Sequence, residues 1–266
     1  MSDAIGGCGI IMGSRESRFS RIYFMIKTAA SRAYWNNHWK ESGFDIVPAI
    51  HPLRSWIEKN IPDTANGACI EIGCFPGKFL AIFGQKGYTL SGIDFFPGTT
   101  TLLPKWLKSR GFHVGDFYEE DFFTADISGQ HDIVSSFGFV EHFENLSAVI
   151  SRHVALVHSG GTIILDVPNL ASPPYSLLYR ILEPEVLKNH VLSVMNKETL
   201  ERAFEENGCT VRNAEYVGNF YFRFVTKHNY TSKLIEKGVN LFAPILNLLP
   251  RHMSARYIGI IATKNP

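Results

Sequence analysis

One stretch in the first third of the chain combines a short apolar run, an acidic residue and a glycine-bracketed turn. The run Ala68–Ile72 predicts a buried strand, and Gly73 and Gly77 bracket the turn that leads into a helix. A second short strand follows and ends at Asp94. Because parallel strands end at one edge of a sheet, Glu71 and Asp94 would flank the turn. This arrangement favours a nucleoside whose hydroxyls need acceptors.

Strands and helices are expected to alternate from residue 68 to residue 167. Alternation at this spacing predicts a parallel sheet with helices on both faces. A helix opened by Asn196 as its N-cap then ends at Gly208, and two more strands follow. The expected strands are 68–72, 89–94, a weak one at 112–115, 133–136, 162–167, 210–217 and 256–263, with helices at 76–86, 100–110, 144–157 and 196–208.

The composition of the turn disfavours a phosphate ligand. A dinucleotide-binding turn needs a middle glycine for close approach of the pyrophosphate, and Phe75 occupies that position. A P-loop needs four residues between its glycines and then Lys-Ser/Thr, but Gly73 and Gly77 are separated by only three and Phe79 follows Lys78. A nicotinamide-linked oxidoreductase is therefore the weaker alternative.

Five segments, in order and at family spacing, resemble the motifs of class I S-adenosylmethionine-dependent methyltransferases. The resemblance covers about residues 50–220 and 255–264. It implies an α/β, Rossmann-like, seven-stranded and mostly parallel sheet with helices on both faces and an antiparallel last strand. It also implies S-adenosyl-L-methionine as the cofactor. The segments are Glu71–Phe79, Gly92–Asp94, Glu120–Phe122, His131–His142 and Leu156–Leu165.

The same resemblance assigns roles in cofactor binding. It places Glu71 near the methionine amino group, Asp94 on the ribose hydroxyls and Asp121 on the adenine amine, with Phe95 or Phe122 stacked on the ring. Two structural alternatives stay open: Asp94 as a helix N-cap, and Glu71 as an acceptor that orients the turn. The implied cofactor-binding residues are Glu71, Gly73, Cys74, Phe75, Gly77, Asp94, Phe95, Asp121, Phe122, Ser136 and Phe137.

Phe75 departs from the family pattern, which has glycine there. We expect its side chain to point away from the ligand, so that the fit is weakened and binding is kept. Cys74 is expected to be a small turn residue, since no adjacent base activates it as a nucleophile.

The candidate catalytic residues are Glu141 and His142, directly after the fourth strand. Ligands of open α/β sheets bind at this carboxyl edge, and a hydroxyl acceptor gains from a base whose pKa is near neutral. His142 is the first candidate for general base or for substrate positioning. The alternative is that the pair only caps the next helix. Weaker candidates for acceptor contacts are His190, Tyr175 and Asn169.

No metal is expected. Relatives that methylate quinone precursors and use a metal carry a second glutamate three residues before the Glu-His pair, where this chain has Gly138. One histidine with one carboxylate is too few ligands for a metal site.

Charge, cysteine content and apolar segments limit the partners and the location that we expect for this protein. A net charge of +1 gives no electrostatic case for nucleic acid. The four cysteines lack metal-ligand or redox spacing, which favours reduced thiols and a cytoplasmic location. No apolar segment approaches the roughly 20 residues that cross a bilayer.

We divide the chain into an N-terminal helical cap (1–60) and a methyltransferase domain (61–266) with a substrate-side insertion at about 169–195. The cap is expected to contain a helix from Arg15 to about Trp35, with basic residues around an apolar face. Residues 230–250 are apolar and broken by proline, which favours a packed helix pair. A weak peripheral membrane contact by these two segments stays open.

These observations predict transfer of a methyl group to a small molecule, at a hydroxyl oxygen of a metabolite, a sugar or a lipid-linked glycan. A methyltransferase-like protein that binds the cofactor without catalysis is the alternative from another functional class. The oligomeric state cannot be predicted from the sequence.

Overall fold

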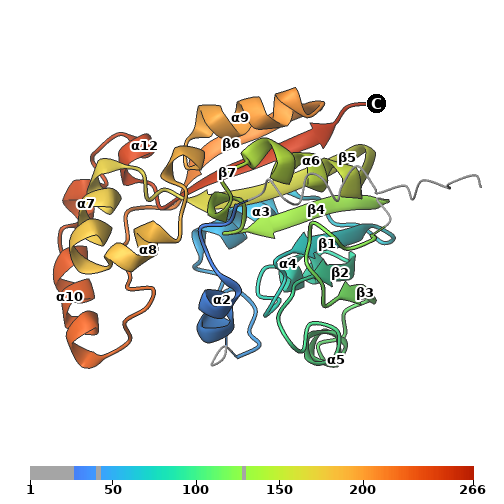
Figure 1. Cartoon of the computed structure of the whole chain (residues 1–266), viewed down its shortest axis with the longest axis horizontal. Coiled ribbons are helices and arrows are strands. Elements are labelled where there is room, and N and C mark those ends of the chain that lie inside the picture. Colours follow the sequence, from blue (N-terminus) through green and yellow to red (C-terminus); the bar gives the residue numbers. More distant parts are fainter. Residues whose placement is uncertain (1–26, 40–42, 128–129) are drawn as a thin grey trace, which may run out of the picture.

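The computed structural model describes residues 27–39, 43–127 and 130–266 (Figure 1). They contain a seven-stranded sheet in the order β3-β2-β1-β4-β5-β7-β6. Strands β1 to β5 run parallel, and β7 pairs antiparallel with both β5 and β6. The strands are β1 (Ala68–Ile72), β2 (Thr89–Ile93), β3 (Val114–Tyr118), β4 (His131–Phe137), β5 (Val157–Pro168), β6 (Cys209–Val217) and β7 (Tyr257–Lys264). The predicted fold class is confirmed.

Alternate strand residues pack into two separate apolar layers. Ile70 and Ile163 lie in one layer, and Cys69 and Ile164 lie in the other. This period of two places helices on both faces of the sheet. The first layer includes residues of α6 (Leu146–Leu156) and α9 (Lys197–Glu206), and the second includes residues of α3 (Pro52–Asn60), α4 (Leu80–Gln85) and α5 (Leu102–Ser109).

Asparagine side chains start the two helices of the first layer. The Asn145 side chain accepts a hydrogen bond from the Ala148 amide at 3.1 Å, and Asn196 accepts one from the Thr199 amide at 2.9 Å. Each bond satisfies a backbone donor that a helix start leaves unpaired. The predicted N-cap at Asn196 is confirmed.

Several sequence predictions need correction. The helix expected from residue 76 begins at Leu80, and the strand expected from residue 162 begins at Val157. The weak strand expected at 112–115 lies at Val114–Tyr118, because β3 extends to pair with the end of β2 at Ile93–Tyr118. The helix expected from Arg15 to Trp35 is not helical at residues 27–31, where Thr28 forms an antiparallel bridge with Phe143. Helix α2 begins later and spans Arg32–Trp39, and residues 15–26 lie outside the described residues.

After β5, the predicted insertion folds into α7 (Pro173–Leu182), α8 (Pro184–Lys188) and the short 3-10 helix η2 (Leu192–Val194). A second helical segment lies between β6 and β7 and contains α10 (Tyr230–Asn240), α11 (Ala243–Leu246) and α12 (Arg251–Ser254). Figure 1 shows α7, α8, α10 and α12 together at one end of the molecule.

The apolar residues of 230–250 are helical as predicted, but many are not packed. Leu234, Leu241, Phe242, Ile245 and Leu248 are between 58% and 84% exposed. The expectation of a packed helix pair is therefore wrong for these side chains. Among the described residues, no helix is both long enough and apolar enough to cross a membrane. The cytoplasmic location stays a prediction.

Candidate methyl-donor site

The turn after β1 is fastened to the end of β2 by backbone hydrogen bonds. The amides of Gly73 and Cys74 both donate to the Ile93 carbonyl, at 2.9 and 3.2 Å. Gly73 has a φ of 70°, in the left-handed region that favours glycine, and a Cβ there would lie 2.9 Å from the Phe139 ring. The sequence therefore needs glycine at this position to bring the turn close to the segment after β4.

Asp94 lies at the end of β2 and holds the turn with both carboxylate oxygens. Oδ2 accepts a hydrogen bond from the Phe75 amide at 3.1 Å, and Oδ1 accepts one from the Phe96 amide at 2.9 Å. Burial is the main cause that raises the Asp94 pKa to about 6, and these amide bonds oppose it. Each oxygen has a further lone pair, so the carboxylate can also accept from ligand hydroxyls.

A cavity of about 320 Å³ opens beside this turn, at the carboxyl edge of the sheet. Segments that follow β1, β2, β3 and β4 all contribute to it, together with residues 28–39. Seven predicted site residues line the cavity: Gly73, Asp94, Phe95, Asp121, Phe122, Phe137 and His142. The cavity lies in the size range of small-molecule and cofactor sites, roughly 300–1,000 Å³.

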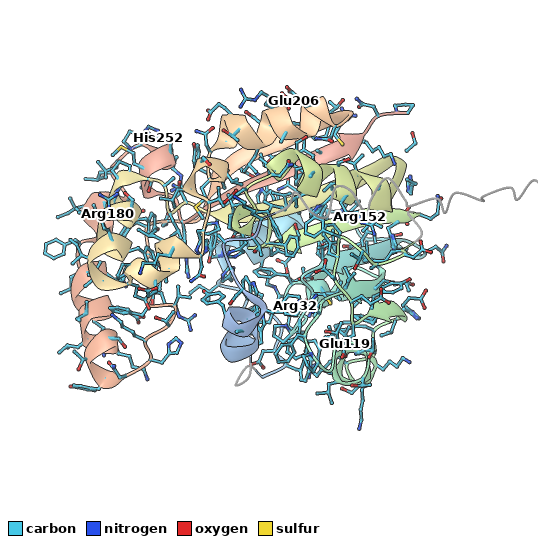
Figure 2. All side chains as sticks on the ribbon, viewed as in Figure 1. Arg32, Glu119, Arg152, Arg180, Glu206 and His252 are labelled. Atoms are coloured by element: carbon cyan, nitrogen blue, oxygen red, sulfur yellow. The ribbon has the colours of Figure 1, made fainter. Side chains whose placement is uncertain are left out.

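Asp121 is paired with the helix that covers the cavity. Its Oδ2 accepts a hydrogen bond from Arg32 Nη2 at 3.1 Å, and its Oδ1 accepts one from the Phe123 amide at 3.0 Å. The Arg32 guanidinium also lies 5.2 Å from the centre of the Phe95 ring. Figure 2 labels Arg32 on the side of α2 that faces the sheet. A ligand base at this position would meet the aromatic ring, the carboxylate and the guanidinium together.

The two candidate stacking rings differ in their surroundings. Phe95 is only partly buried, whereas Phe122 is buried and contacts the rings of Phe139 and His153 edge-on. A partly exposed ring is available to a ligand face, and a ring held by edge contacts forms part of the wall.

The remaining five predicted cofactor residues do not line the cavity: Glu71, Cys74, Phe75, Gly77 and Ser136. Phe75 is buried, with its ring centre 4.4 Å from that of Phe96, and it does not line the cavity. Cys74 is buried, and burial raises the pKa of its thiol, which suits a small turn residue. Ser136 is buried with its hydroxyl 3.0 Å from His153 Nε2. At Gly77, whose φ is 85°, a Cβ would lie 2.5 Å from Leu103 Cδ1.

Glu71 is buried at the end of β1. Its Oε2 is without a hydrogen-bond partner among the described residues. Burial, and secondarily the charge of Asp94, raise the Glu71 pKa well above the ordinary value of a glutamate. A cationic ligand group nearby would relieve both effects.

The candidate catalytic pair lies on the 3-10 helix η1 (Val140–His142), directly after β4. Both Glu141 and His142 are buried, and His142 Nε2 lies 3.9 Å from Glu141 Oε1. His142 lines the cavity with its ring edge-on to Trp35, at 4.8 Å between ring centres. Burial, and secondarily the charge of Asp166, raise the Glu141 pKa well above its ordinary value.

The three weaker acceptor candidates separate in the structure. Tyr175 accepts a hydrogen bond from the Tyr221 amide at 3.1 Å, and Asn169 donates to the His252 and Ala255 carbonyls at 3.0 Å each. Neither residue lines the cavity, so both hold the C-terminal segment in place. His190 instead lies against His142, with ring centres 4.5 Å apart, and burial lowers its pKa.

The sequence predicted an N-terminal helical cap but not which of its residues line the cavity. Thr28, Ala30, Arg32, Trp35 and Trp39 line it, although they precede β1 by some thirty to forty residues. The bridge from Thr28 to Phe143 and the hydrogen bond from the Ala29 amide to the His142 carbonyl, at 2.7 Å, hold this segment there. The aromatic residues of this segment can be read from the sequence. No local sequence pattern predicts which part of the fold they pack against.

The comparison with protein families agrees with this geometry. Residues 48–214 match the family described as a methyltransferase domain. The chain belongs to this family. Its class, the S-adenosylmethionine-dependent methyltransferases, is the one that the sequence resembles, and its cofactor is S-adenosyl-L-methionine.

Relatives of this chain include ubiquinone biosynthesis O-methyltransferases. The protein of Stutzerimonas stutzeri is 26% identical over 151 residues, which cover 56% of this chain and 63% of that protein. The protein of Pseudomonas fluorescens is 26% identical over 163 residues, which cover 60% of this chain and 67% of that protein. The match to the first relative thus spans less than two thirds of its length.

Solved structures show the same fold. A phosphoethanolamine N-methyltransferase 2 of Haemonchus contortus, in complex with S-adenosyl-L-methionine, has a TM-score of 0.57 at 15% identity, covering 82% of this chain and 54% of that one. The magnesium protoporphyrin IX methyltransferase of Synechocystis, with bound SAH, has a TM-score of 0.51 at 14% identity, covering 80% of each chain.

Proposed function

We propose that this protein transfers the methyl group of S-adenosylmethionine to a hydroxyl oxygen of a small-molecule acceptor. The observation that carries the proposal is the position of His142, which lines the cavity that Asp94 and Gly73 also line. A group able to act on a hydroxyl proton thus lies in the space expected for the methyl donor. The ubiquinone biosynthesis relatives, named as O-methyltransferases, support oxygen as the acceptor atom.

The cofactor is expected to lie along the edge of the sheet. Asp94 would accept hydrogen bonds from the ribose hydroxyls, and Phe95 and Asp121 would meet the adenine. The methionine ammonium would lie near the turn, where Glu71 Oε2 is buried without a partner among the described residues. Such a pairing offsets the cost of that buried oxygen.

The transfer itself needs alignment more than activation. The sulfonium methyl is already electrophilic, so the protein has to hold the acceptor oxygen in line with it and exclude water. The rings of Trp35, Phe139 and Phe143 line the cavity and supply an apolar wall. His142 would take the hydroxyl proton or orient the hydroxyl while the C–O bond forms and the C–S bond breaks.

The test combines cofactor binding with methyl transfer. We expect the purified protein to bind S-adenosylhomocysteine by calorimetry and to move a labelled methyl group into an extract of the source organism. The label should appear in the small-molecule fraction and be stable to mild base, as an ether is. Cofactor binding without transfer to any extract component would support a non-catalytic binding protein instead. Tighter binding of NADH would contradict the proposal.

We also propose that α10 and α11 contact a membrane surface, which would suit a lipid-linked acceptor. Nine large apolar side chains of α7 and the 230–248 segment are at least 36% exposed: Leu177, Ile181, Tyr230, Leu234, Ile235, Leu241, Phe242, Ile245 and Leu248. Exposed basic residues lie beside them, namely Arg180, Lys227, Lys233 and Lys237. Figure 2 labels Arg180 at this end of the molecule. Apolar side chains with a basic rim match an anionic lipid surface.

Replacing Leu241, Phe242 and Leu248 together by serine should release the protein from vesicles that contain anionic lipid. The reason is that each side chain would contribute up to about 1.5–3 kcal/mol when buried in an apolar phase. Vesicle co-sedimentation measures the bound fraction. Leu102→Ser is the matched control, because Leu102 is also exposed (54%) but lies on α5. Equal sedimentation of the triple variant and the wild-type protein would contradict this contact.

A further inference from the structure

Three side chains of metal-ligand type meet at His142, which lines the cavity. Glu141, His142 and His190 each offer one donor atom, and these atoms all lie within 4.8 Å of one another. Two of the residues follow β4, and the third follows α8. A hydrogen bond from the Val191 amide to the Glu141 carbonyl, at 2.7 Å, fixes the two segments side by side. The fold therefore brings His190 to the Glu141–His142 pair as a third possible ligand, which the sequence alone did not predict.

Backbone carbonyls set the tautomer of both histidines. His142 Nδ1 lies 2.6 Å from the Asn189 carbonyl oxygen, and His190 Nδ1 lies 2.6 Å from the Val186 carbonyl oxygen. A carbonyl only accepts, so each Nδ1 carries the hydrogen and each neutral ring has its lone pair on Nε2. Metal-binding histidines are held by this kind of second hydrogen bond.

The carboxylate of the cluster is buried and incompletely satisfied. Glu141 is 1% exposed, and its Oε2 has no hydrogen-bond partner among the described residues. An unpaired carboxylate oxygen in the interior is costly, and a coordinated cation removes that cost. This oxygen is a second observation, independent of the histidine geometry, that points to a ligand.

We propose that Glu141, His142 and His190 bind one divalent transition-metal ion of the Zn²⁺ type. Two imidazoles and one carboxylate suit Zn²⁺ or Co²⁺, whereas Mg²⁺ prefers oxygen ligands alone. Three protein ligands leave a fourth position open, as in catalytic zinc sites. Zn–N distances of about 2.0–2.1 Å need ligand atoms roughly 3.3 Å apart, so the side chains would close by rotation around the ion.

The role of the ion rests on the proposed function: with its Nε2 on the ion, His142 would act on the hydroxyl through the ion and not as the base itself. An acceptor hydroxyl at the open position would have its pKa lowered by the metal and release its proton to water. The oxygen would then form the C–O bond to the methyl carbon. The electron pair of the broken C–S bond stays on sulfur, and neutral S-adenosylhomocysteine leaves.

Metal binding can be measured without any methyl transfer. Full-length protein freed of metal by a chelator is titrated with Co²⁺, whose visible absorption reports its ligands, and Zn²⁺ is then added to displace it. We expect one equivalent to bind. His190→Ala should weaken binding by more than the roughly 10–100-fold that loss of a second-shell partner costs. Glu141→Gln, which keeps the size of the side chain, should weaken it as well.

His113→Ala is the matched control, because His113 is exposed on the chain before β3 and lies outside the cluster. S-adenosylhomocysteine binding by each variant shows that it is folded. No saturable Co²⁺ binding by the wild-type protein would overturn the proposal. So would equal affinity of His190→Ala and His113→Ala. Cofactor binding and methyl transfer by the metal-free protein would leave the proposed function standing while removing the metal from it.

Discussion

Replacing His142 by alanine is expected to lower kcat by about 10²–10⁴-fold, the usual contribution of a positioned proton-transfer group. The expectation holds whether the ring nitrogen takes the acceptor proton or holds an ion that lowers the pKa of the acceptor hydroxyl. Cofactor affinity should change little, because Asp94 and the turn after β1 are intact in this variant. Single-turnover transfer of labelled methyl, at several pH values, separates the chemical step from product release.

A ring-preserving variant sharpens this test. The imidazole of His142 packs edge-on against Trp35, so alanine also removes a wall of the cavity. His142→Phe keeps a ring there without a ring nitrogen and should lose as much activity as His142→Ala. Normal turnover of both variants across pH would exclude a role for His142 in the transfer. His113→Ala again serves as the control for loss of a histidine.

Asp94 is expected to carry the largest share of cofactor affinity. Asp94→Ala should weaken S-adenosylhomocysteine binding by at least tenfold, since a hydrogen bond to a charged group contributes about 1.5–3 kcal/mol. It also leaves the amides of Phe75 and Phe96 without their acceptor, which loosens the turn. Calorimetric titration gives the affinity. Asp116→Ala, at an exposed carboxylate of β3, is the control.

The pH dependence of binding follows from the Asp94 pKa of about 6. The ionised carboxylate is the stronger acceptor for the ribose hydroxyls, so affinity should be full above pH 6 and fall as pH drops through that value. The fall should be absent in Asp94→Ala. Unchanged affinity of that variant would mean that the ribose is held elsewhere.

The sequence was sufficient for the sheet because its signals are local. Apolar runs such as Ala68–Ile72 and caps such as Asn196 specify an element by themselves, and the motif order specifies the topology. Asp94, Asp121 and His142 could be placed because each follows a strand at the same edge. The boundaries of β3 could not, since pairing with β2 sets them.

The rest of the site depends on tertiary contacts that leave no local trace. Trp35 reaches the cavity only because residues 27–31 leave the helical path and bridge to Phe143. His190 joins Glu141 and His142 only because η1 and the loop after α8 share a backbone hydrogen bond. The exposure of Leu241 and Phe242 was missed for a related reason: an apolar segment predicts burial, and only the fold tells whether anything covers it.

The backbone carbonyls of two consecutive residues, Glu141 and His142, hold two other segments of the chain in place. The Glu141 carbonyl accepts from Val191 and the His142 carbonyl accepts from Ala29, so the covering segment and the insertion are both anchored beside the reacting groups. The cofactor half of the site, from β1 to β3, makes neither bond. New acceptor preferences could therefore be selected by varying residues of 27–39 and 184–195 other than Arg32, which contacts Asp121 and Phe95, and His190, the proposed metal ligand.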